Sequence, residues 1–115
     1  MRRDEVSLSD MRNAARRASN YVAGMTRDVF VADDRTKAAV VREMEIMGEA
    51  AVRISQAFRD THPTIPWSTL IRIRNFYIHV YRRVNYPMVW QTCRNTIPHI
   101  HDAVTKIISP DVETE

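Results

Sequence analysis

The sequence has little glycine, a single cysteine and no long apolar run. Its 115 residues include two glycines and are 44% hydrophobic, a composition that favours a compact helical protein over a β-rich or disordered one. No apolar stretch approaches the roughly 18 residues of a membrane-spanning helix, and the polar start MRRDEVSLSD has no signal-peptide core. Cys93 has no second cysteine with which to form an internal disulfide. We therefore expect a cytoplasmic protein that does not enter a membrane.

Acidic residues are absent from Thr61 to His101, a stretch of 41 residues. An even distribution of the 14 acidic residues would place about five of them there. The stretch instead holds five arginines: Arg72, Arg74, Arg82, Arg83 and Arg94. This one-sided charge indicates a positive surface for a polyanion or an acidic partner. The alternative is a small helical protein that simply keeps its acidic residues on other helices.

The spacing of apolar residues predicts an all-α protein. Ser9 is placed to cap a first helix that ends near Gly24, and Thr26 to cap a short helical turn. Asp33 or Asp34 then opens the longest helix, which runs to about residue 60. Gly48 lies in the middle of this helix, where we expect it to permit close contact with another helix.

Prolines punctuate the second half of the chain. Pro63 ends the long helix, and Pro66 suits the first turn of the next one, which runs to about Tyr81. Asn85 is placed to cap a last helix that Pro98 should kink. The expected architecture is an antiparallel up-and-down bundle of four main helices plus a short helical turn. We expect one domain over residues 1–115, with a core of about 9–108 and short flexible termini.

The predicted fourth element carries the decapeptide RIRNFYIHVY, residues 72–81. Asn75 and His79 are four residues apart and share a stripe, and Arg74 and Tyr81 share another, whereas Arg74 and His79 are about 140° apart. A histidine that moves protons and an arginine that binds phosphate suit the cleavage of RNA, which supplies its own 2′-hydroxyl nucleophile. Because the two side chains diverge, a complete site should need two copies of the chain. On spacing alone, a surface histidine without catalytic function remains an alternative.

Four blocks of the sequence resemble one family, the HepT-like toxins, which are ribonucleases of the HEPN (higher eukaryote and prokaryote nucleotide-binding) superfamily. The R-x4-H-x-Y signature of that family resembles RNFYIHVY. Its long second helix, with the pattern R-x-x-E-x-x-G-E-A, is similar to AVVREMEIMGEAAVRIS. The segment before its motif helix resembles HPTIPWSTLIRIRN, and its last helix resembles VWQTCRNTIPHI. Together the blocks cover about residues 10–108 in the order of the family.

The resemblance implies a helical bundle that dimerises through the motif helix and forms a metal-independent endoribonuclease site, without a cofactor, at the interface. It implies catalytic roles for Arg74 and His79, supported by Asn75, and we expect Glu49 to approach the motif helix. It also implies a toxin of a type VII toxin–antitoxin system. The antitoxin would be an MntA-like nucleotidyltransferase that silences the toxin by transferring AMP to Tyr81.

The three arginines Arg72, Arg82 and Arg83 are expected to bind RNA phosphates. Val80 and Arg72 depart from the family pattern. The position of Val80 is often acidic or glycine in the family, and the position of Arg72 is often glycine. Both departures bear on substrate fit and antitoxin access. A non-catalytic helical module that binds a nucleotide or a nucleotidyltransferase is the alternative function. Tyr81 has its own alternative, as a buried residue in the last turn of the helix.

The remaining histidines do not have the spacing of a metal site, since His99 and His101 diverge on a helix and no Cys–His cluster accompanies them. No metal is therefore expected. Trp67 and Trp90 are predicted to anchor the core, and Cys93 to be a buried apolar residue.

Overall fold

The structure, a computed structural model, describes residues 2–79 and 84–108. For residues 2 and 76–79 it describes the backbone only. The described residues are almost entirely helical. Their helices are α1 (Arg2–Val22), α2 (Arg27–Ala32), α3 (Asp34–Arg53), α4 (Gln56–Thr61), α5 (Trp67–His79), α6 (Tyr86–Arg94) and α7 (Thr96–Ile107).

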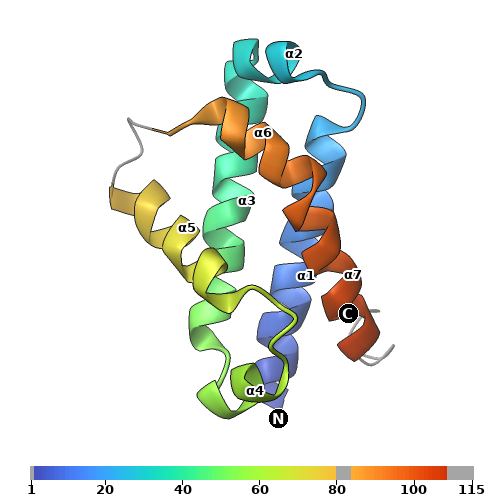
Figure 1. Ribbon diagram of the computed structural model, residues 1–115, viewed down its shortest axis with the longest axis vertical. Helices are drawn as coiled ribbons and strands as arrows, with labels where there is room; N and C mark the ends of the chain where they lie inside the picture. The colour runs from blue at the N-terminus through green and yellow to red at the C-terminus, as the bar shows by residue number, and fades with distance from the viewer. Residues whose placement is uncertain (1, 80–83, 109–115) are drawn as a thin grey trace.

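The long helices form an up-and-down bundle, which confirms the predicted fold class (Figure 1). Helix α3 packs against α1 on one side and α5 on the other, and α7 packs along α1. The short helices α2 and α4 lie at opposite ends of the bundle, where the chain reverses direction. Helix α5 is thus an outer helix whose main packing partner is α3. Among the described helices, none is both long enough and apolar enough to cross a membrane.

The core is built from the helical stripes that the sequence predicts. Met11, Val40 and Ile100 are among the fully buried residues, from α1, α3 and α7 respectively. Trp67 is 8% exposed and Cys93 is 1% exposed, so both are buried as expected. Tyr21 of α1 is 39% exposed, and its hydroxyl donates a hydrogen bond to Glu43 of α3.

Helix α1 begins at Arg2, so the predicted start at Ser9 is wrong. The additional turns are held by Asp4, which is 3% exposed and accepts hydrogen bonds from the backbone N–H (3.0 Å) and the hydroxyl (2.7 Å) of Ser55. Leu8, at 1% exposure, adds an apolar contact with the core. These contacts come from residues far along the chain, and they outweigh the local preference of Ser9 for a cap position.

The long helix predicted to reach residue 60 instead ends at Arg53, and α4 follows as a separate helix. Ser55 is the reason, since its hydroxyl caps α4 by accepting from the N–H of Phe58 at 3.2 Å. A serine hydroxyl that bonds the backbone in this way competes with helix continuation. The apolar spacing of Ile54 and Phe58 continues through the break, which explains why periodicity alone misses it.

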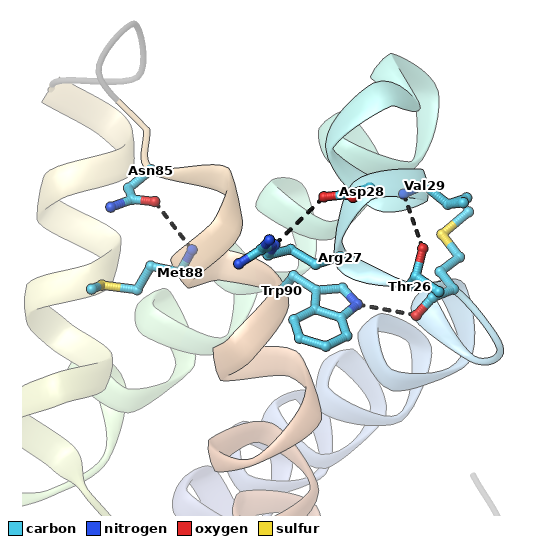
Figure 2. A network of polar contacts seen from close by, with 8 residues as sticks. Thr26, Arg27, Asp28, Val29, Asn85, Met88 and Trp90 are labelled. Atoms are coloured by element: carbon cyan, nitrogen blue, oxygen red, sulfur yellow. Dashed lines mark hydrogen bonds and ion pairs between the residues drawn. The ribbon is translucent and has the colours of Figure 1, made fainter.

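Capping residues at the other chain reversals are as predicted. Thr26 accepts from the N–H of Val29 at 3.2 Å, and Asp33 accepts from the N–H of Thr36 at 3.0 Å. Figure 2 shows how Asn85 caps α6 by accepting from the backbone N–H of Met88. In the same view the indole N–H of Trp90 donates to the carbonyl of Met25 at 3.1 Å, which joins α6 to the end of α1.

The predicted last helix is divided in two. Helix α6 ends at Arg94, and α7 begins at Thr96 with Pro98 in its first turn. A proline lacks the backbone donor for residue i−4 and crowds its carbonyl, and here residue i−4 is Arg94. The kink expected at Pro98 is therefore present as a full break just before it.

Candidate active site

The start of α5 is anchored on α4. Trp67, the first residue of α5, donates its indole N–H to the carbonyl of His62 at 2.9 Å. The Trp67 ring meets Phe58 edge to face, with centroids 6.2 Å apart, and Phe58 stacks in turn on the His62 ring at 3.9 Å. The carbonyl of Pro66 accepts from the N–H of Leu70, so this proline directly precedes the helix. The position of the motif helix is thus set by the turn that contains the two prolines.

Gly48 brings α3 and α5 into direct backbone contact. A methyl group at Gly48 would overlap the Cβ of Arg74 and lie 2.9 Å from both its Cγ and the carbonyl oxygen of Leu70. Any side chain at position 48 would therefore push α5 away from α3. The close helix contact expected at Gly48 is present, and it occurs at Arg74.

The Arg74 guanidinium is held by its neighbours on both sides. Its Nη2 lies 3.1 Å and 3.3 Å from the two carboxylate oxygens of Glu49, and its Nη1 donates to the side-chain oxygen of Asn75 at 2.7 Å. The Arg74 side chain is 29% exposed, and its Nε is buried without a hydrogen-bond partner among the described residues. Charge-assisted bonds from two directions orient a guanidinium, while the exposed part can still meet an anion. Glu49 approaches the motif helix as expected.

The other predicted site residues are placed only in part. Asn75 and Arg72 are both exposed. The backbone of His79 belongs to α5, whereas its side chain lies outside what the structure describes. Tyr81, Arg82 and Arg83 lie outside the described residues altogether. The structure therefore brings together Glu49, Arg74 and Asn75, and the relation of His79 and Tyr81 to them stays a prediction.

A groove of about 800 Å³ lies between α4 and the first half of α5. Its apolar lining includes Ile65, Trp67 and Ile71. Its polar lining consists of Gln56, Arg59, Asp60, Ser68, Arg72 and Asn75. Sequence reasoning identified only Arg72 and Asn75 of this polar set, because α4 was merged into the preceding helix and its side chains could not be placed.

A second polar cluster joins α1 and α3. The Arg17 guanidinium contacts both oxygens of Glu43 at 2.9 Å, and the Tyr21 hydroxyl donates to Glu43 at 3.1 Å. The pKa of Arg17 and the pKa of Tyr21 are both raised, and the hydrogen bond to Glu43 is the largest cause in each case. Glu43 is 6% exposed and already has these partners, so the cluster joins two helices and is structural.

The remaining histidines have separate partners. His62 contacts Thr61 and the Phe58 carbonyl, His99 lies 3.4 Å from the Thr64 carbonyl, and His101 pairs with Asp102. Burial raises the pKa of the Cys93 thiol to about 12, so the thiol is protonated at neutral pH. Cys93 thus lacks the thiolate character of a nucleophile.

Comparison with known proteins identifies ribonucleases as relatives of this chain. The chain matches the family described as "Ribonuclease HepT-like" over residues 11–107. It is 33% identical over 96 residues to a "Putative RNase" of Methanocaldococcus jannaschii, covering 84% of this chain and 78% of the relative. It is 32% identical over 100 residues to the "Probable ribonuclease HepT" of Thermococcus cleftensis, covering 87% of this chain and 91% of the relative. No solved structure matches the chain.

The fold and these relatives define a class, the helical ribonucleases of the HEPN type. Within that class, the chain belongs to the HepT-like ribonuclease family. The matched region contains α3, α5 and the turn between them, and so includes every residue of the candidate site from Glu49 to Tyr81.

Proposed function

We propose that the protein is the toxin of a type VII toxin–antitoxin system, a metal-independent endoribonuclease of the cytoplasm with Arg74 and His79 as its catalytic residues. Membership of the HepT-like ribonuclease family supports the substrate class. The observation that carries the assignment of residues is the pair of contacts that orients Arg74, from Glu49 on α3 and Asn75 on α5. A guanidinium fixed in this way stabilises negative charge that develops on a phosphate.

The proposed reaction uses the 2′-hydroxyl of RNA as nucleophile. His79 of one subunit removes its proton, the P–O2′ bond forms, and the P–O5′ bond breaks. The departing 5′ oxygen takes up a proton from water, and a 2′,3′-cyclic phosphate is left. Arg74 binds the non-bridging oxygens as their charge rises, and Asn75 keeps the guanidinium in place. The substrate supplies the nucleophile, so the mechanism requires no cofactor.

A homodimer is proposed because α5 separates the two catalytic positions. Arg74 lies on the side of α5 that packs against Gly48 of α3, whereas position 79 is about 140° around the helix. The outer stripe of α5 faces away from α3. Two α5 helices that meet across a two-fold axis at their second halves would bring Arg74 of one copy near His79 of the other and leave the first half of each α5 accessible.

Complementation between variants tests the composite site. Arg74→Ala and His79→Ala should each abolish RNA cleavage while preserving helical content by circular dichroism. When the two variants are co-expressed, a mixed dimer retains one intact Arg74–His79 pair and should recover part of the activity. Cleavage should persist in EDTA and leave DNA intact. A mixed dimer that forms and stays inactive would contradict the composite site, and strict dependence on magnesium would contradict the mechanism.

Silencing is proposed to occur at Tyr81. The phenolate oxygen attacks the α-phosphate of ATP and pyrophosphate leaves, so that an adenylyl group is joined to Tyr81 by the partner nucleotidyltransferase. The added phosphate would compete for the arginines that bind RNA, namely Arg72, Arg82 and Arg83. Co-expression with a nucleotidyltransferase from the neighbouring reading frame should add adenylyl mass to the wild type and none to Tyr81→Phe. An inhibited but unmodified protein would mean that silencing occurs by complex formation.

A further inference from the structure

The exposed stripe of α5 leads from the α4–α5 groove to the catalytic position. Ser68, Arg72 and Asn75 are all exposed, line the groove and are spaced four and three residues apart. His79 follows four residues later on the same helical stripe. The stripe lies opposite Leu70, which is 2% exposed and faces α3. A ligand in the groove is therefore in line with the proposed catalytic centre.

The chemistry of the groove suits a single nucleic-acid strand. Its exposed or partly exposed apolar residues, Pro63 and Ile71, offer a surface for a base, and Arg59 and Arg72 offer positive charge for phosphates. Single-stranded RNA is bound in this manner, with bases on apolar or aromatic surfaces and arginines along the backbone. The Arg59 Nε donates to the carbonyl of Ile54 at 3.2 Å, which leaves its two Nη groups for the groove.

One acidic residue faces the same groove. Asp60 accepts a hydrogen bond from the Gln56 amide at 2.8 Å, so one of its oxygens is engaged. A carboxylate repels phosphate and accepts hydrogen bonds from base amino groups. Asp60 and Gln56 therefore suit the base side of a strand, and the two arginines suit its phosphate side.

We propose that the α4–α5 groove binds the single-stranded RNA that flanks the scissile bond. This subsite rests on the proposed ribonuclease function and extends it to residues of α4. Ser68 and His79 are eleven residues apart on α5, about 16 Å at 1.5 Å per residue. At about 3.4 Å per stacked nucleotide, this span corresponds to roughly five nucleotides on one side of the cleavage position.

Ser68→Glu is the sharpest probe of the groove. Ser68 is the second residue of α5, where a carboxylate is favourable to the helix and folding should be preserved. The new carboxylate would lie four residues before Arg72, where it would pair with that guanidinium and repel RNA phosphates. Gln91→Glu is the matched control, because it adds the same charge at an exposed position of α6 outside the groove.

Binding is measured in the His79→Ala background so that the RNA stays intact. The probe is a fluorescent random-sequence single strand long enough to fill the groove. Ser68→Glu should weaken its affinity about fivefold or more, and Gln91→Glu should leave it unchanged. Arg72→Gln should also lower the slope of log affinity against log salt by about 0.7, as expected for the loss of one phosphate contact with single-stranded RNA. With His79 present, Ser68→Glu should abolish the advantage of long substrates over dinucleotides, whereas Gln91→Glu should retain it.

Equal RNA affinity of the Ser68→Glu and Gln91→Glu proteins would overturn the groove assignment, as would the absence of measurable RNA binding. If the wild type cleaves RNA while Ser68→Glu has no effect, the proposed function stands and the subsite fails. If the wild type binds RNA but does not cleave it, and Ser68→Glu lowers the RNA affinity, the subsite stands and the proposed function fails.

Discussion

Gly48→Ala tests whether the contact between α3 and α5 controls both stability and the site. The new methyl group would overlap the Cβ of Arg74 and lie 2.9 Å from the Leu70 carbonyl oxygen. Overpacking costs about 1 to 3 kcal/mol, and the upper end applies here because neither of these atoms can rotate away. Alanine regains about 1 kcal/mol of helix propensity over glycine. The net loss of folding free energy should be about 2 kcal/mol.

This loss can be expressed as a melting temperature. An unfolding entropy of about 2.1 cal/mol/K per residue amounts to about 0.24 kcal/mol/K for this chain, so Gly48→Ala should melt about 8 °C below the wild type. Separation of the helices should also move Arg74 relative to Glu49. A displacement of about 1 Å in a catalytic group lowers kcat/KM by up to about 100-fold, and RNA cleavage below the melting temperature should show a loss of this order.

The other glycine of the chain, Gly24, supplies the control. Gly24 has a φ of +78°, and a methyl group there would meet nothing within 4 Å. Gly24→Ala should therefore cost about 1 kcal/mol through backbone strain alone and leave kcat/KM unchanged. Adding Arg74→Gly to Gly48→Ala removes the overlapping Cβ, so the double variant should be more stable than the sum of the single effects predicts. A Gly48→Ala protein that melts at or above the wild-type temperature would refute the close contact.

Three further predictions follow from buried or oriented polar groups. Glu49→Gln keeps a hydrogen-bond acceptor for Arg74 and Glu49→Ala does not, so kcat/KM should be highest for the wild type, lower for Glu49→Gln and lowest for Glu49→Ala. Equal values for the two variants would contradict a positioning role for Glu49. Burial raises the pKa of Cys93 from 9.0 to about 12, which means that the folded state retains the thiol proton. The resulting stabilisation is complete below about pH 9 and is lost as the pH rises toward 12, by about 1.4 kcal/mol per pH unit, and urea titrations should show a flatter alkaline profile for Cys93→Ala. Asp4→Ala leaves the backbone N–H of Ser55 unpaired and should cost about 1 to 3 kcal/mol, with faster hydrogen exchange in the first two turns of α1; unchanged exchange there would show that Leu8 alone holds these turns.

Local sequence features predict much of the secondary structure. Thr26, Asp33 and Asn85 cap helices as expected, because each contact lies within three residues along the chain. The start of α1 was mispredicted because Asp4 is held by Ser55, a residue 51 positions away. The break after α3 was missed for a related reason, since Ser55 interrupts an apolar period that continues through it.

The sequence by itself determined the all-α class, the position of Gly48 opposite another helix and the alignment of Asn75 with His79. Each of these depends on helical periodicity or on the size of one side chain. Only the tertiary structure decided that Arg74 lies against Gly48 and Glu49, because this requires the relative placement of α3 and α5. The α4–α5 groove is likewise a product of tertiary packing: Arg59 and Arg72 both line it, and the edge-to-face contact of Phe58 with Trp67 joins the two helices.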